Sequence, residues 1–300
     1  MSNATAPRGA VVITGVSTGI GRSTAQGLIA RGLRVFGSVR SEADAARLSG
    51  ELGPAFTPLV FDVTDEAAVR AGAALVRQEL GGQRLLGLVN NAGIALAGPL
   101  MHQPVAEYHR QIEVNLVAPL IVTQAFLPLL GADPELAGAP GRIVNISSVG
   151  GRIAAPFIGA YAASKHGLEG FSESLRRELL LYGIDVIVVA PGAVATPIWE
   201  KADQTDIGPY AGTAYAGPLQ AFKRTMLTQG RRGLPPERIT ATIWEALTNP
   251  RPRARYAVVP QQLLNWTLPR LLPVRLLDRL FARRLGLRPA QPDHAVVARG

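Results

Sequence analysis

Seven short apolar runs recur along this chain, and a segment of helix length follows each of the first six. The runs are almost continuously apolar, which is typical of parallel strands buried on both faces. The predicted strands span residues 10–14, 34–39, 56–62, 85–90, 142–147, 185–190 and 255–259. Strands that alternate with helices imply right-handed crossover connections. The sequence therefore predicts an α/β fold, a single doubly wound domain with a parallel seven-stranded sheet and helices on both faces.

The composition permits this fold and excludes several kinds of chemistry. Of the 300 residues, 47% are hydrophobic, enough for a sizeable core. The absence of cysteine excludes disulfides and thiolate chemistry, and the four histidines lack ligand spacing, so no metal is expected. The absence of cysteine also favours a reducing compartment, and the first ten residues lack the pattern of an export signal. The predicted location is cytoplasmic.

Two segments depart from the alternation of strands and helices. Residues 193–234 are rich in Gly, Pro, Thr and Tyr without a clear period, and we expect a mobile substrate lid there within a domain spanning 1–260. The longest apolar run, 114–130, contains Asn115 and two prolines, so it fits a buried helix better than a membrane span.

The remaining residues, 261–300, form a predicted basic amphipathic extension. Residues 1–230 carry 18 basic and 18 acidic side chains, whereas 231–300 carry 13 and 4, so the net charge of +9 lies near the C-terminus. Leucines and arginines recur there at helical spacing, namely Leu271, Leu272, Leu276, Leu277, Leu280, Phe281 and Leu285 with Arg275, Arg279, Arg283 and Arg284. Such a helix can contact an anionic membrane surface or pack on protein. No nucleic-acid partner is expected, because interleaved aromatic residues are lacking.

Small and polar residues follow four of the predicted strands. TGVSTGIG (14–21), NNAG (90–93), the serine pair 147–148 and PGAVATP (191–197) all stand at carboxyl ends, where doubly wound sheets bind ligands. Glycines between a strand and a helix let the backbone approach a phosphate at the helix N-terminus. A plain tight turn needs the same residues, but the position at the head of a βαβ unit favours phosphate binding.

These motifs, together with Ser148, Tyr161 and Lys165, resemble the short-chain dehydrogenase/reductase family in chain order over roughly residues 8–260. The extended tail is similar to that of hydroxysteroid and retinol dehydrogenases. The resemblance implies a Rossmann fold and an enzyme that transfers a hydride between a nicotinamide cofactor and a ketone or secondary alcohol. It also implies a homodimer or homotetramer.

The resemblance assigns cofactor contacts to four segments. In the glycine loop they are Gly15, Ser17, Thr18, Gly19, Ile20 and Gly21; at the adenosine they are Asp62, Val63, Asn90, Ala92 and Gly93; around the nicotinamide they are Tyr161, Lys165, Pro191, Gly192, Val194 and Thr196. Asn90 is alternatively a purely structural turn residue.

The end of the second predicted strand bears on the choice between NADP and NAD. Val39 stands where an acidic residue would bind the ribose 2′-hydroxyl of NAD, and Arg40 follows it. A guanidinium suits a 2′-phosphate, so NADP is favoured, with Arg22 as a second contact. Arg40 as an ordinary surface residue is the alternative, and the nearby Glu42 leaves NAD open.

The segment YAASK suggests the catalytic pair. The chain has three lysines against twenty-eight arginines, yet Lys165 stands one helical turn after Tyr161. A neighbouring ammonium and a cationic nicotinamide are expected to lower the pKa of a phenol from its usual value near ~10. By resemblance, Tyr161 is the acid/base and Asn115 anchors a water relay to the lysine.

Ser148 is predicted to bind the reacting oxygen. It stands thirteen residues before Tyr161, the family's spacing, and is preferred to Ser147 for that reason. His166 is expected to be structural or exposed, because adjacent helix positions point about 100° apart.

An apolar wall is predicted around the substrate. Val149, Ile153, Phe157, Ile198 and Trp199 are the predicted contacts, and Tyr210, Tyr215, Leu219 and Phe222 extend the surface. Such a wall suits a hydrophobic steroid-, retinoid- or aryl-ketone-like substrate, although a dimer contact would use similar residues. The alternatives to an enzyme are a non-catalytic NAD(P)-binding regulator and a protein that docks on a membrane or a partner.

Overall fold

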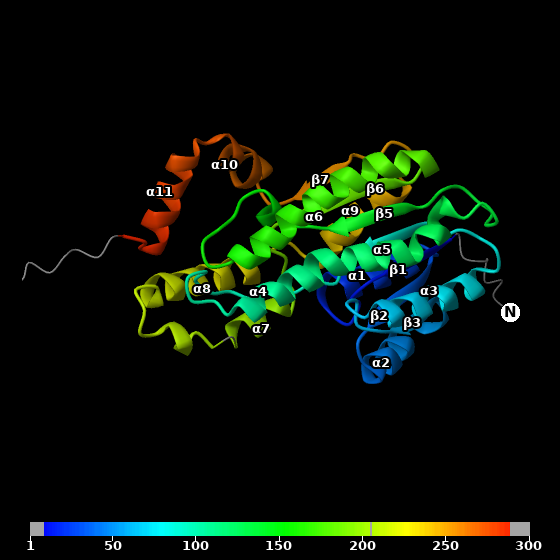
Figure 1. Cartoon of the computed structure of the whole chain (residues 1–300), viewed down its shortest axis with the longest axis horizontal. Helices are drawn as coiled ribbons and strands as arrows, with labels where there is room; N and C mark the ends of the chain where they lie inside the picture. The colour runs from blue at the N-terminus through cyan, green and yellow to red at the C-terminus, as the bar shows by residue number, and fades with distance from the viewer. Residues whose placement is uncertain (1–8, 205, 289–300) are drawn as a thin grey trace, which may run out of the picture.

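The computed structural model describes residues 9–204 and 206–288, and its centre is one parallel sheet (Figure 1). The strands are β1 (Ala10–Ile13), β2 (Arg34–Val39), β3 (Phe56–Val60), β4 (Gly87–Asn90), β5 (Arg142–Ile146), β6 (Asp185–Pro191) and β7 (Arg255–Val258). Their order is β3-β2-β1-β4-β5-β6-β7, and every pairing is parallel. The predicted fold is confirmed. The strand order reverses between β1 and β4, which makes their carboxyl ends the expected ligand site.

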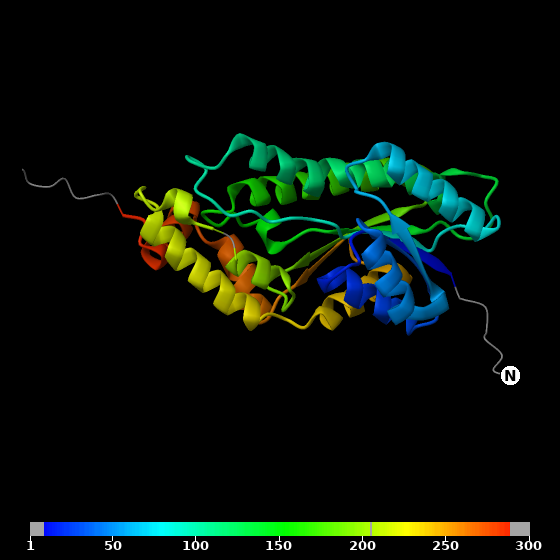
Figure 2. The same ribbon diagram turned by 90° about the horizontal axis from the view of Figure 1, so that it is seen from below.

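Helices cover both faces of the sheet in three layers (Figure 2). The helices are α1 (Gly19–Ile29), α2 (Glu42–Leu52), α3 (Glu66–Leu80), α4 (Val105–Ile112), α5 (Ala118–Leu127), α6 (Gly159–Glu178), α7 (Ile198–Asp203), α8 (Ala216–Arg231), α9 (Pro236–Thr248), α10 (Leu268–Leu271) and α11 (Val274–Leu285). Helices α1, α2 and α9 pack on one face and α3, α5 and α6 on the other. Each face of the sheet buries its own apolar cluster, so the protein has two hydrophobic cores, one on either side of the sheet.

Residues 105–132 form one long helix that runs from α4 through α5. Among the described residues, it alone is long and apolar enough to cross a membrane by length and composition, with a mean hydropathy of 1.7. Ala118, Val122 and Phe126 are nonetheless buried in the cluster that faces the sheet. The predicted buried helix is therefore confirmed, and its apolar composition is explained by packing inside the protein.

Residues 193–234 contain more regular structure than the sequence predicts. Helices α7 and α8 occupy much of this segment, so the expected lack of regular structure is wrong, and its role as a mobile substrate lid stays a prediction. Helix α8 buries Leu219 and Phe222, and its Gly230 packs directly against the ring of Trp199. Glycine and proline hide the helical period in the sequence, but these contacts stabilise the helix.

The C-terminal extension is two helical pieces rather than one helix. The first piece, η7 (Leu263–Thr267) with α10, ends at Leu272, whose backbone is extended before Pro273. The second piece, α11, meets α8 at its C-terminal end (Figure 1). The ends of the predicted regions 1–260 and 261–300, residues 1–8 and 289–300, lie outside the described residues.

One face of α11 packs on the domain and the other is exposed. Leu285 is buried and Phe281 is partly buried against Leu219 and Phe222 of α8. Exposed apolar side chains remain on the extension at Leu263, Leu268, Leu271, Val274, Leu276 and Leu280. Packing on the parent domain, one of the two alternatives for this extension, is therefore confirmed for one helix face.

Candidate active site

The glycine loop between β1 and α1 has the backbone of a phosphate cradle. Gly15 and Gly19 have φ angles of 70° and 60°, a region that favours glycine. A methyl group at Gly21 would collide with the Gly15 carbonyl oxygen and the Asn91 side chain. Thr18 precedes the first turn of α1, which has no acidic residue to compete with an anion. The loop thus fits a pyrophosphate.

Two residues that sequence reasoning missed hold this loop against the next motif. The Thr14 hydroxyl accepts hydrogen bonds from the backbone amides of Asn91 and Ala92, both at 3.0 Å. The Asn91 side chain donates to the carbonyl oxygens of Thr14 and Gly15 at 2.9 and 3.0 Å. Thr14 lies in the motif TGVSTGIG and Asn91 in NNAG. The motifs therefore indicated these positions, but not the hydrogen bonds that the two residues form.

The loop after β6 closes over the same cradle. A methyl group at Gly19 would lie 3.5 Å from Cβ of Thr196. Gly192 continues β6, because its amide donates to the Val258 carbonyl at 3.0 Å. The Val194 carbonyl accepts a hydrogen bond from the Trp199 indole at 2.6 Å. The structure therefore brings two of the predicted cofactor segments together.

Arg40 and Asp62 lie near each other at the ends of β2 and β3. Burial would raise the pKa of Asp62, but hydrogen bonds from Thr64 and the charges of Arg40 and Arg110 lower it below its usual value. Arg40 is exposed and forms no ion pair with any other residue that the structure describes. Arg22, the expected second phosphate contact, is instead paired with Glu51 at 2.8 Å.

Asn90 braces the sheet. Its buried side chain donates to Thr123 of α5 at 3.2 Å and to Asn145 of β5 at 2.9 Å, and Asn145 donates to Ser172 of α6 at 2.8 Å. These bonds give Asn90 a structural role inside β4 rather than in a turn, and its buried Oδ1 has no hydrogen-bond partner among the described residues. A cofactor contact through Asn90 stays a prediction.

Tyr161 and Lys165 share one face of α6, as their spacing predicts. The Lys165 ammonium nitrogen lies 5.9 Å from the centre of the Tyr161 ring and donates to the Ile146 carbonyl at the end of β5 at 2.9 Å. Ser148 lies two residues beyond that strand, and a methyl group at Gly150 would lie 3.3 Å from the Tyr161 ring and 3.4 Å from the Ser148 hydroxyl oxygen. These three side chains meet beside the glycine cradle.

Burial changes the pKa of both groups in a way that the sequence did not predict. Burial raises the pKa of Tyr161 above 10.0, and the hydrogen bond from Ser148 opposes the change only in part. Lys165 is not among the causes that change the pKa of Tyr161 here, and the expected lowering by the lysine together with a cationic nicotinamide stays a prediction. Burial lowers the pKa of Lys165 from 10.5 to about 8, although the negative charge of Glu169 opposes it.

Asn115 occupies a π-helical turn, η2 (Glu113–Val117), in the middle of the long helix. Its fully buried side chain accepts from the Ile94 amide at 2.9 Å and donates to the Ile94 carbonyl at 2.8 Å and the Ser164 hydroxyl at 3.0 Å. A methyl group at Gly93 would lie 3.1 Å from the Asn115 oxygen and 3.7 Å from the Lys165 nitrogen. The helix is therefore distorted at Asn115, and the water relay stays a prediction.

The predicted substrate residues lie in three places. Phe157 has a φ angle of 68° and joins a cluster that we call the outer apolar cluster, made of the buried residues Phe157, Tyr210, Leu219, Phe222 and Leu285. Val149 and Ile153 belong to the loop after Ser148. Ile198 is 43% exposed, and Trp199 packs on α8 instead of facing Tyr161. The contribution of Leu285 was missed, because the extension had no predicted place in the site.

Comparison with known proteins agrees with this geometry. The family model for short chain dehydrogenase matches residues 9–207. The chain is 39% identical to an NADPH-dependent 3-dehydrocapnine reductase from Ornithobacterium rhinotracheale, covering 91% of this chain and 96% of that protein. It is 36% identical to mouse retinol dehydrogenase 5, covering 94% and 90%. A short-chain dehydrogenase structure from Streptomyces avermitilis matches with a TM-score of 0.71 at 28% identity, covering 92% and 94%.

The chain belongs to the short-chain dehydrogenase/reductase family. It is an oxidoreductase that acts on CH–OH or carbonyl groups with a nicotinamide cofactor.

Proposed function

We propose that this protein is an NADP(H)-preferring oxidoreductase for a hydrophobic ketone or secondary alcohol. One observation carries the proposal: Ser148, Tyr161 and Lys165 meet at the carboxyl end of the sheet, next to a glycine cradle that fits a pyrophosphate. A protein that only binds the cofactor, without catalysis, would not require these three side chains.

The proposed mechanism divides the work among three side chains. The nicotinamide supplies or accepts the hydride when bound. Ser148 and Tyr161 donate hydrogen bonds to the carbonyl oxygen and stabilise the negative charge that develops on it. Tyr161 then transfers its phenolic proton to that oxygen, and the Lys165 ammonium stabilises the remaining phenolate. Asn115 holds the backbone at Ile94 and the Ser164 hydroxyl near Lys165. Lys165 then leads a proton back to Tyr161.

The raised pKa of Tyr161 agrees with its proposed role as the acid in the reduction step. Because burial raises the pKa of Tyr161, the phenol keeps its proton at neutral pH and is ready to act as an acid. Reduction needs this protonated form, whereas alcohol oxidation needs the phenolate. The relative from Ornithobacterium rhinotracheale is also named a reductase.

Two observations support NADP over NAD. Arg40 is exposed at the end of β2, where an acidic residue would repel a 2′-phosphate, and Val39 beside it is neutral. The relative from Ornithobacterium rhinotracheale is named NADPH-dependent. Arg22 no longer supports this preference, because Glu51 engages it.

The outer apolar cluster supports a lipophilic substrate. Phe157 lies two residues before α6, which carries Tyr161, and its ring packs edge-on against Tyr215 and Phe222 at 6.1 and 5.6 Å between ring centres. An apolar surface next to the reacting groups binds apolar molecules and excludes water. The similarity to a retinol dehydrogenase agrees with a substrate of this class.

A substrate panel tests the proposal. Steroid, retinoid and small aryl ketones are supplied to the full-length protein with NADPH, and absorbance of the reduced cofactor is followed. We expect turnover with at least one lipophilic ketone and a lower rate with NADH. Binding of NADPH without turnover of any ketone or alcohol would favour the regulator alternative.

The exposed leucines of the extension support a second proposal, peripheral contact with a membrane. Leu263, Leu271 and Val274 are 71%, 75% and 74% exposed, and basic side chains accompany them. Flotation with anionic vesicles tests it: the full chain should float and a chain ending at Pro260 should not. Failure of the full chain to float would leave a cytoplasmic protein without membrane contact.

A further inference from the structure

Glu169 is a buried carboxylate that the proposed mechanism does not use. It lies on α6 one helical turn after Lys165, and only 3% of it is exposed. Burying an acidic side chain is costly unless it is paired. Its partners therefore indicate why it is there.

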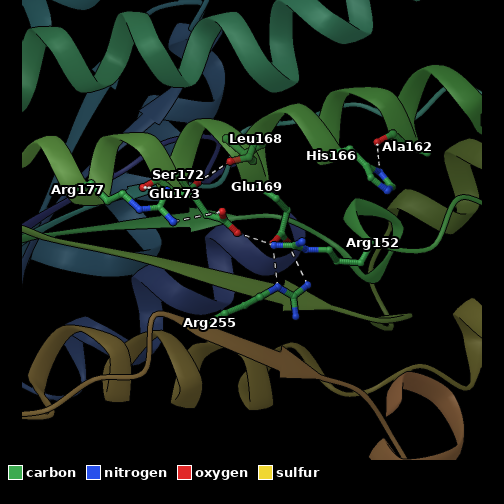
Figure 3. Close-up of polar contacts among 9 residues, drawn as sticks. All are labelled: Arg152, Ala162, His166, Leu168, Glu169, Ser172, Glu173, Arg177 and Arg255. Carbon is green, nitrogen blue, oxygen red and sulfur yellow. Dashed lines mark hydrogen bonds and ion pairs between the residues drawn. The ribbon is translucent and has the colours of Figure 1, made fainter. Parts of the chain in front are cut away.

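Two arginines from different elements hold the Glu169 carboxylate (Figure 3). Arg255 of β7 donates through Nε to Oε2 at 2.9 Å and through Nη2 to Oε1 at 3.1 Å, a two-pronged contact. Arg152, in the loop after Ser148, approaches Oε2 through Nε at 3.3 Å. Arg152 also donates to Glu173 at 2.8 Å, and the side chain of Glu173 is 41% exposed.

The loop that follows Ser148 packs directly on two residues of α6, Lys165 and Glu169. A methyl group at Gly151 would lie 3.0 Å from the Lys165 carbonyl oxygen and 3.1 Å from Cγ of Glu169. Arg152 is the next residue, so its ion pair fixes the loop at the point of contact. Moving Glu169 would therefore also loosen the loop that carries Ser148.

Glu169 is a negative charge one helical turn from Lys165, and it opposes the effect of burial on the pKa of that lysine. Lys165 faces the Tyr161 phenol on its own helix, the neutral Asn115 near Gly93, and the Ile146 carbonyl. Burial disfavours its ammonium form, and the charge of Glu169 is what opposes burial. Around Glu169 stand Arg152 and Arg255, so the balance of charges near the lysine depends on one carboxylate.

We infer that Glu169 is a positioning residue for the reaction: held by Arg152 and Arg255, it keeps Lys165 charged and fixes the Ser148 loop on α6. This inference rests on the role proposed above for Lys165. The competing explanation is an ion-pair cluster that only joins β7 to α6, and such a cluster would affect stability without changing how activity depends on pH.

The test is the pH dependence of kcat/KM for ketone reduction by the full-length enzyme. Activity should fall at high pH as Lys165 loses its proton. In Glu169→Gln this fall should move to lower pH by about one pH unit, because the stabilising negative charge is gone. Glu169→Asp keeps the negative charge, so its pH profile should lie close to that of the parent enzyme. Glu173→Gln is the matched control, since Glu173 binds the same Arg152 but is exposed, and its profile should stay in place.

Arg152→Gln should shift the pH profile in the opposite direction. This second test does not depend on whether Glu169→Gln folds. Removing this positive charge leaves Glu169 less neutralised, so the fall in activity should move to higher pH. A profile for Glu169→Gln that coincides with the parent, or one for Arg152→Gln that moves to lower pH, would overturn the inference. Tyr161→Phe run in parallel keeps the two proposals apart, because its activity reports only on the proposed function.

Discussion

Burial acts on Tyr161 and Lys165 in opposite directions, and both changes favour the neutral form. The pKa of Tyr161 rises and that of Lys165 falls to about 8, so the phenol keeps its proton at neutral pH while the lysine remains mostly protonated. The sequence predicted the residues and their shared helix face, because spacing fixes both. It could not predict the direction of the tyrosine pKa change, because burial depends on side chains from distant segments.

Arg40 is expected to determine the preference for NADP. Arg40→Ala should raise KM for NADPH about tenfold or more and leave KM for NADH nearly unchanged, since a charge-assisted hydrogen bond contributes about 1.5–3 kcal/mol. Steady-state kinetics with both cofactors checks this. Arg70→Ala, on the exposed face of α3, is the control. An equal loss with both cofactors would mean that Arg40 does not bind the 2′-phosphate.

Gly21 is expected to tolerate no side chain. Gly21→Ala should weaken NADPH binding at least tenfold, because the added methyl meets the Gly15 carbonyl and the Asn91 side chain. Fluorescence titration with NADPH measures the change. Gly50→Ala in α2 is the matched control, since nothing lies within 4 Å of its added methyl, and alanine should stabilise that helix by about 0.5–1 kcal/mol. Unchanged NADPH binding by Gly21→Ala would argue against a close backbone approach at this loop.

Among the elements, the parallel sheet was predictable and the covering segments were not. Strands β1, β4 and β6 are buried on both faces, so their apolar runs appear directly in the sequence. Helix α8 has Gly217, Pro218 and Gly230, which weaken its local signal, and it is stabilised by packing. The extension showed the reverse error: its regular leucines suggested one helix, but Pro273 divides it.

Leu285 connects the extension to the predicted substrate region. Leu285→Ala should loosen α11 from α8 and raise KM for bulky ketones about fivefold, because removing a buried leucine costs about 2–5 kcal/mol in local packing. KM for a small aryl ketone should change little. Leu280→Ala on the same helix is the control, as Leu280 is 49% exposed. Equal effects of the two variants would contradict a role for α11 in the outer apolar cluster.

At the scale of the whole molecule, the buried Lys165 lowers the free energy of unfolding at neutral pH, although catalysis requires it. Lys165 has a pKa of 10.5 as an ordinary side chain and about 8 in the folded state, so below pH 8 the folded protein carries a buried charge at a cost of up to about 3 kcal/mol. Between pH 8 and 10.5 the folded lysine loses its proton before the unfolded one, and this contribution to stability rises with pH.

Lys165→Met should therefore raise Tm by several degrees at pH 7 while abolishing turnover. The gain should shrink as pH rises from 8 towards 10.5. Thermal unfolding across this pH range measures both effects, with Lys223→Met, at a half-buried lysine that donates to the Asp203 carbonyl at 2.6 Å, as control. A variant less stable than the parent at pH 7 would show that the contacts of Lys165, including its hydrogen bond to Ile146, outweigh the burial cost.

The account as a whole depends on a phenol that delivers a proton to the substrate oxygen. Tyr161→Phe keeps the ring and removes only the hydroxyl, so the most direct measurement compares kcat with NADPH affinity in this variant. We predict that kcat falls at least a thousandfold, of the order of lost acid–base catalysis at about 10²–10⁴, while the Kd for NADPH changes less than about threefold. Turnover close to that of the parent enzyme would contradict the assignment of Tyr161 as the acid.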